Sequence, residues 1–204
     1  MTSLDCTIKN TDFTVPWKAV FSWKLLICTL LINLLASFVV TGQTANEYLN
    51  STLEQKLAVI SAMEDKNQAL VRVLSLSEDD SLSHLDKLAV FACQAQVYQQ
   101  LGQLDKAIDS AQKEQQLANK LSLSQREADA FKMIGVYAYF KGENSLALES
   151  YQQSLNFYLT LDEPIAQANL HNNIALVHAK TSEFESALSS YQKAEKIYQE
   201  FGTE

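Results

Sequence analysis

The chain has 204 residues and a formal net charge of −8, with only five glycines and two prolines. Long helices therefore meet few interior breakers, and no strand-like alternation competes with them, so the composition favours an all-α protein. The negative charge makes nucleic acid an unfavourable partner, because a phosphate backbone attracts basic proteins.

The N-terminal segment has the build of an export signal. Residues 25–40 are an apolar run that follows Lys9, Lys18 and Lys24 and precedes Thr41-Gly42. We expect residues 1–42 to be a secretory signal cleaved after Gly42. A retained membrane anchor and a buried soluble helix are the alternatives, since the run is near the lower length limit for a spanning helix. Under the first two readings the rest of the chain is exported, either free in the periplasm or anchored and facing it.

Residues 43–83 are expected to form a degenerate helical hairpin, with helices at 46–63 and 66–76. Leu49, Leu53, Leu57 and Ile60 recur at helical spacing in its first half. This spacing predicts one apolar face that packs against the second half of the hairpin.

The remaining residues, 84–204, repeat one pattern every forty residues. Ala107, Ala147 and Ala187 occupy the same place in three copies. Six helices are predicted, at 84–101, 104–121, 124–141, 144–161, 164–181 and 184–201. Pro164 suits a first helical turn, and Asp162 is expected to cap that helix.

The copies resemble the tetratricopeptide repeat (TPR). Each first helix carries a bulky residue (Phe91, Phe131 or His171), a glycine or Ser182 lies in the turn, and a small residue opens each second helix. The resemblance implies an α-solenoid of antiparallel helix pairs, here three clear repeats after the hairpin. The chain is also similar to the exported TPR sensory regions of bacterial signalling proteins.

In TPR proteins the first helix of each repeat lines the concave face, which implies a binding surface for a protein or an extended peptide. The polar and aromatic residues at the usual contact positions are the expected peptide-binding residues. They are Gln96, Gln99, Gln100, Lys132, Tyr139, Phe140, Asn169, Asn172 and Lys180. The alternative is that these side chains only keep an exposed face soluble.

No motif for catalysis, a cofactor or a metal site stands at a recognisable spacing, so an enzyme is not expected. The sequence favours a non-catalytic exported TPR protein that binds a protein or peptide. The alternative is the sensory input portion of a membrane signalling protein, of the diguanylate cyclase or histidine kinase type. The last repeat lacks a polar capping helix, so self-association through Ile197 and Phe201 is a further expectation.

Overall fold

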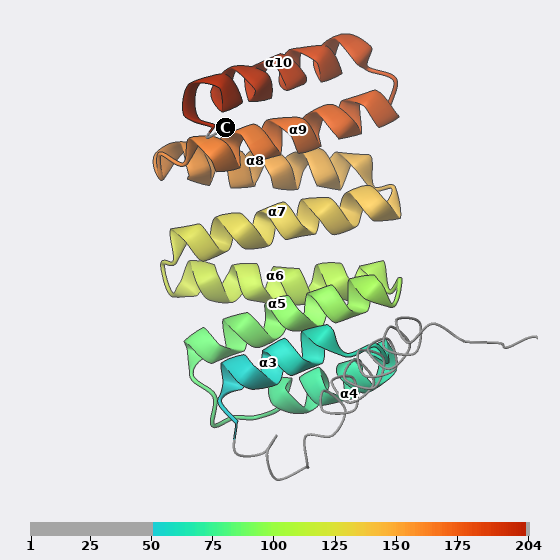
Figure 1. The fold of residues 1–204 in the computed structure, drawn as a ribbon, viewed down its shortest axis with the longest axis vertical. Coiled ribbons are helices and arrows are strands. Elements are labelled where there is room, and N and C mark those ends of the chain that lie inside the picture. The colour runs from blue at the N-terminus through green and yellow to red at the C-terminus, as the bar shows by residue number, and fades with distance from the viewer. Residues whose placement is uncertain (1–50, 203–204) are drawn as a thin grey trace, which may run out of the picture. The chain divides into compact units, whose positions relative to one another are not determined.

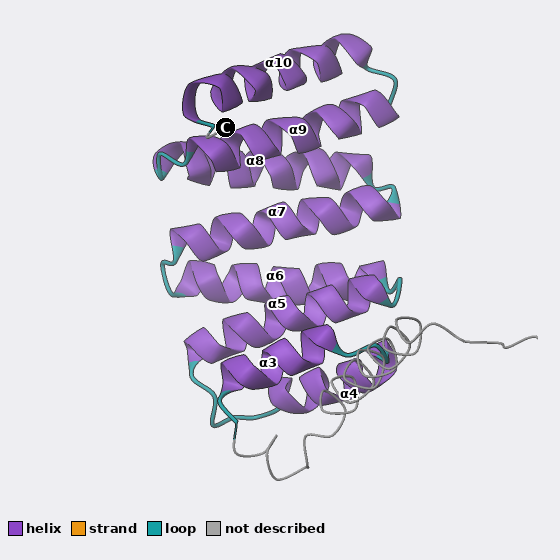
Figure 2. Cartoon of the chain, in the orientation of Figure 1, coloured by secondary structure: helices purple, strands orange, loops and turns teal. Residues whose placement is uncertain are grey.

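The computed structural model describes residues 51–202, which are all-helical (Figures 1 and 2). The described part contains no strand, and none of its helices is long and apolar enough to cross a membrane. The predicted signal or anchor at residues 1–42 lies outside the described residues. The helices are α3 (Leu53–Ala62), α4 (Lys66–Ser77), α5 (His84–Gln100), α6 (Leu104–Lys120), α7 (Ser124–Lys141), α8 (Asn144–Thr160), α9 (Pro164–Lys180) and α10 (Phe184–Phe201).

The first described helix starts later than its apolar spacing suggested. Thr52 is the N-cap of α3, and its hydroxyl accepts a hydrogen bond from the backbone N–H of Gln55. The Gln55 side chain accepts in return from the Thr52 backbone, which completes a capping box. Residues 51 and 52 are therefore not helical, although the sequence predicted a helix from residue 46 onward. Residues 46–50 lie outside the described part.

The turn inside each repeat uses left-handed backbone. Gly102 and Gly142 have φ of 71° and 91°, and Ser182 has φ of 65° at the equivalent place. Glycine adopts this conformation without the steric cost that a Cβ brings. Asp162 also has positive φ, at 55°, in the turn before α9. It is therefore a turn residue and not the predicted cap, because Glu163 takes the N-cap position and makes no side-chain cap.

Small residues set the distance between the two helices of a repeat. Ala107 and Ala147 are 0% exposed and Ala187 is 4% exposed. Gly135 of α7 lies so close to Tyr151 of α8 that a Cβ added at this glycine would stand 2.6 Å from the ring. A bulky residue on one helix is thus matched by a small one on the other, as close packing requires.

Successive helices run antiparallel and stack along one axis (Figure 1). Each first helix (α5, α7 and α9) packs against the second helix of its own pair. The helices α7 and α9 also pack against the second helix of the preceding pair, α6 and α8 respectively. A shared apolar core, which includes Tyr137, Tyr158 and Leu170, runs through the three repeats. The hairpin α3–α4 packs on α5 through a second cluster around Ile60 and Val73.

Candidate functional site

Each of the first helices α5, α7 and α9 exposes one row of side chains along its length. We call the three rows together the first-helix stripe, and every residue in it is at least partly exposed. The spacing of four, then three, then four residues keeps each row on one side of its helix. The stripe comprises Leu85, Ala89, Ala92, Gln96, Gln99 and Gln100 of α5, Gln125, Asp129, Lys132, Val136, Tyr139 and Phe140 of α7, and Ile165, Asn169, Asn172, Leu176, Ala179 and Lys180 of α9.

The stripe on α7 carries an internally satisfied charged group. The Lys132 ammonium lies 2.8 Å from Asp129 Oδ1, and the Tyr158 hydroxyl of α8 donates to the same oxygen at 2.6 Å. Burial pushes the pKa of Asp129 upward, but the hydrogen bonds from Lys132 and Tyr158 outweigh it and leave that pKa below its usual value. Lys132, predicted as a ligand-binding cation, is thus paired within the chain.

The stripe on α9 is held in a similar way. The Tyr198 hydroxyl of α10 donates to Asn169 Oδ1 at 2.6 Å and receives a longer hydrogen bond, at 3.4 Å, from Asn172. Tyr198 and Asn169 stand forty residues after Tyr158 and Asp129, so the repeat reproduces this contact with an amide in place of the carboxylate.

Lys180 joins neighbouring repeats. Its ammonium donates to the backbone carbonyl of Tyr139 at 2.8 Å and lies 4.4 Å from the centre of the Tyr139 ring. Such a cation–π contact orders both side chains. Phe140 meets the other side of Tyr139 edge-on, with ring centroids 5.8 Å apart.

The stripe residues whose side chains make no hydrogen bond within the chain differ in kind between α5 and the helices α7 and α9. Within the described residues, the side chains of Gln96, Gln99 and Gln100 on α5 make no hydrogen bond. On α7 and α9, Phe140 is 61% exposed and Leu176 is 44% exposed. We call Phe140, Leu176 and the half-buried Val136 the apolar patch. The stripe therefore offers free amides and the 62% exposed Leu85 on α5, and the apolar patch on α7 and α9.

A second polar cluster lies between α6 and α7. Glu114 is 4% exposed, and its Oε1 forms an ion pair with Arg126 Nη2 at 2.9 Å. Burial raises the pKa of Glu114 to about 7, although Arg126 opposes the shift. Nearby, the buried Glu127 accepts hydrogen bonds from Gln115 at 2.7 Å and from Asn119 at 3.0 Å.

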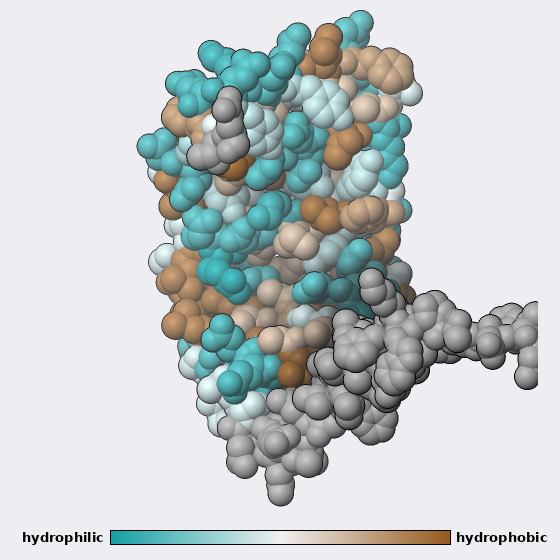
Figure 3. Space-filling view, viewed as in Figure 1, coloured by the Kyte–Doolittle hydropathy of each residue, from teal (hydrophilic) through white to brown (hydrophobic). Residues whose placement is uncertain are grey.

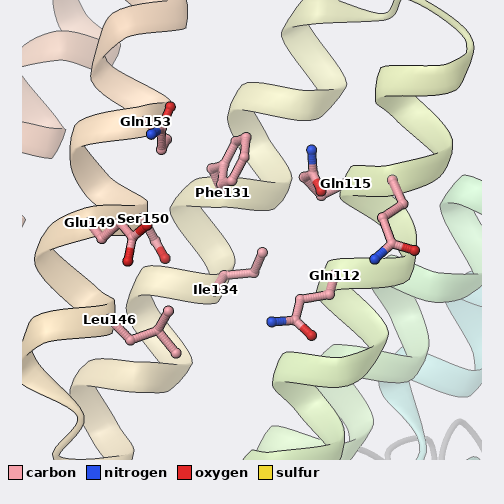
Figure 4. Close-up of a pocket in the computed structure, with 9 residues that line it drawn as sticks. Gln112, Gln115, Phe131, Ile134, Leu146, Glu149, Ser150 and Gln153 are labelled. Atoms are coloured by element: carbon pink, nitrogen blue, oxygen red, sulfur yellow. The ribbon is translucent and has the colours of Figure 1, made fainter.

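A cavity of about 270 Å³ lies between α6, α7 and α8 (Figure 4). Its walls are polar and apolar in about equal measure, and none of the nine predicted binding residues lines it. Its lining residues are Gln112, Gln115, Gln116, Phe131, Ile134, Leu146, Glu149, Ser150 and Gln153. The cavity was not expected from the sequence, because its floor is formed where residues of three helices meet.

All nine predicted binding residues lie on the first-helix stripe, but they do not converge on one point. Tyr139 and Lys180 touch across repeats, and Tyr198 links Asn169 and Asn172. None of Tyr158, Tyr198, Leu85 and Ile165 was predicted from the sequence as a binding residue. The signal for the tyrosines was present, since each follows its hydrogen-bond acceptor on the stripe by 29 residues.

The surface offers no obvious site for a metal. Among the described residues, no group of three or more His, Cys, Asp or Glu side chains could hold a metal ion. The face seen in Figure 3 mixes hydrophilic and hydrophobic side chains over its whole length.

No family model and no curated protein matches the sequence. Solved structures do match the fold. A crystal structure of MamA aligns with a TM-score of 0.58 at 17% identity, over 72% of this chain and 77% of that chain. BtubC (BKLC) from P. vanneervenii aligns with a TM-score of 0.55 at 16% identity, over 73% of this chain and 57% of that chain. These similarities support the all-α, TPR-like solenoid fold expected from the repeats.

Proposed function

We propose that this protein binds a partner protein through an extended peptide segment laid along the first-helix stripe. The observation that carries the proposal is the apolar patch, because Phe140 and Leu176 stay exposed on neighbouring helices although the side chains around them are held in place. Exposed apolar residues in a polar surface are typical of interaction sites. The patch supplies the anchor of the peptide.

The rest of the stripe supports a peptide as the bound form. Gln96, Gln99 and Gln100 each carry an amide that both donates and accepts, which suits the alternating N–H and C=O groups of an extended backbone. The stripe carries only Asp129, Lys132 and Lys180 as charged residues, and the first two neutralise each other. Recognition thus rests on apolar contact and amide hydrogen bonds.

The test is selection from a display library of random twelve-residue peptides against the purified full chain. Peptides that bind should lose at least fivefold in affinity for Phe140→Ser and for Leu176→Ser, since hydrophobic anchors dominate such interfaces. Leu159→Ser is the matched control, because Leu159 is 57% exposed on α8 and lies outside the stripe.

Equal weakening by Leu159→Ser would contradict the proposal, as would a library that yields no binder. Far-UV circular dichroism of each variant checks that helicity is retained. Retained helicity ensures that a loss of binding reports the surface and not the fold.

Export of this module, with residues 1–42 as a signal or an anchor, belongs to the same proposal. Its support is the apolar run at residues 25–40 behind three lysines. A role as the sensory input portion of a membrane signalling protein stays a prediction from the sequence resemblance.

A further inference from the structure

The last described helix, α10, exposes a face that its counterpart α8 keeps covered. Each helix packs on the first helix of its own pair, α9 and α7 respectively, but α8 is also covered by α9 on a second side. Tyr151 of α8 is 2% exposed, whereas Tyr191, forty residues later, is 38% exposed. Leu148 is half-buried and its counterpart Leu188 is 59% exposed.

These residues belong to one row on α10. The row contains Phe184, Leu188, Tyr191 and Glu195, which recur at helical spacing, and we call it the open stripe of α10. Phe184 is 68% exposed. Ile197, which the sequence led us to place on an interaction surface with Phe201, lies outside this row and is half-buried, whereas Phe201 is 51% exposed; self-association through these two residues stays a prediction. Among residues 51–202, no element packs on the open stripe.

The repeat itself indicates what kind of element fits. Leu155 of α8 is 5% exposed beneath α9. The equivalent of Leu155 in α6 is Gln115, which donates to Glu127 in the first turn of α7. A residue at this position of a second helix therefore faces the fourth residue of the helix packed on it.

In α10 this position is held by Glu195, an exposed carboxylate that accepts only a 3.5 Å hydrogen bond from Gln199 of its own helix. A helix packed on the open stripe would cover Glu195 partly, which is costly unless the helix brings an opposite charge. A second copy of α10 brings none, because Glu195 is the one charged residue of the stripe. The stripe thus requires apolar residues and one cation from its partner.

We propose that the open stripe of α10 binds an amphipathic helix of another protein, antiparallel to α10 as α9 is to α8, with a lysine or arginine at the position that Glu127 holds in α7. The interface continues the solenoid by one helix, so its geometry is that of the interfaces between α6 and α7 and between α8 and α9. The partner helix ends the stack at a surface separate from the first-helix stripe.

The probe is a synthetic peptide of residues 124–141, which form α7, in its natural form and as the Glu127→Lys variant. Isothermal titration against the full chain should show the Glu127→Lys peptide binding at least tenfold more tightly than the natural peptide. The Glu195→Lys protein should reverse this order. Glu200→Lys is the matched control, since Glu200 is an exposed glutamate of α10 outside the open stripe, and it should keep the original order.

Four outcomes would overturn the proposal. One is that neither peptide binds, and another is that Glu200→Lys reverses the order as Glu195→Lys does. The third is a concentration-dependent dimer of the full chain in sedimentation that Leu188→Ser abolishes, which would make a second copy the occupant. Loss of peptide binding in Phe140→Ser would place the peptide on the first-helix stripe and would also count against the proposal, while supporting the proposed function.

Discussion

Glu114 should make the stability of the solenoid depend on pH near neutrality. Its carboxyl group lies in the α6–α7 interface at 4% exposure, and burial raises its pKa to about 7 from an ordinary value of 4.5. The ion pair with Arg126 offsets burial only in part, because the Arg126 side chain is 41% exposed and remains hydrated. The folded protein therefore holds this proton more tightly than the unfolded chain does.

The sign and size follow from linkage between proton binding and folding. Because the pKa of Glu114 is higher in the folded state, the free energy of unfolding falls as pH rises from about 4.5 to about 7. Each pKa unit corresponds to about 1.4 kcal/mol, so the whole shift amounts to about 3 kcal/mol. Below the ordinary pKa of glutamate, both states hold the proton, so this group no longer makes the stability depend on pH.

The variant Glu114→Gln keeps the shape of the side chain but cannot ionise. Its unfolding free energy relative to the natural protein should therefore rise by about 3 kcal/mol between pH 4 and pH 8. Urea unfolding of both full chains, followed by far-UV circular dichroism at four pH values, measures this difference. All other titrating groups are common to both proteins and cancel.

Glu149→Gln is the control, because Glu149 is exposed on α8. Its difference from the natural protein should stay within about 0.5 kcal/mol at every pH. A difference for Glu114→Gln that does not change with pH would refute the reasoning. It would mean that the carboxyl group is hydrated well enough to ionise as it does in the unfolded chain.

Three further predictions address packing, the tyrosines and export. Ala147→Phe should lower the unfolding free energy by about 1–3 kcal/mol through overpacking, while the exposed Glu149→Ala changes it by less than about 0.5 kcal/mol; equal thermal shifts in calorimetry would contradict this. Tyr158→Phe removes a buried hydrogen bond to a carboxylate and should cost about 1.5–3 kcal/mol in urea unfolding, whereas Tyr198→Phe, at a half-buried site with a neutral acceptor, should cost about 1 kcal/mol or less. A reporter that works only outside the cytoplasm should be active when fused to residues 1–60, and a stable but silent fusion would exclude export.

The ends of the repeat helices could be predicted because the same sequence pattern occurs in three copies, so each copy locates the helix ends independently. Small residues at Ala107, Ala147 and Ala187 mark the same close contact, so the predicted ends lie within about one residue of the observed ones. The hairpin had no second copy to align with it. The capping box at Thr52 was not identified from the sequence, and the helix was predicted to extend upstream of Thr52 because Leu49 continues the apolar spacing of Leu53 and Leu57.

The candidate site was predictable only as a surface. Helical spacing alone puts Lys132, Asn169 and Lys180 on the exposed row of their helices. Lys132 pairs with Asp129 of its own helix, but the partner of Asn169 lies 29 residues downstream and that of Lys180 lies 41 residues upstream, on other helices. Helical periodicity says nothing about such contacts, because they depend on how neighbouring helices cross.

The tyrosines of the second helices show how the first-helix stripe changes character along the stack. Tyr158 and Tyr198 reach through from α8 and α10 and fix Asp129 and Asn169 with short hydrogen bonds. The first repeat has alanines, Ala89 and Ala118, at both of the corresponding positions, so nothing from α6 restrains the glutamines of α5 in this way. Under the proposed function, a bound segment meets ordered side chains around the apolar patch, where little rotamer entropy remains to be lost, and adaptable amides on α5. That proposal therefore assigns position and affinity to α7 and α9, and tolerance of sequence to α5.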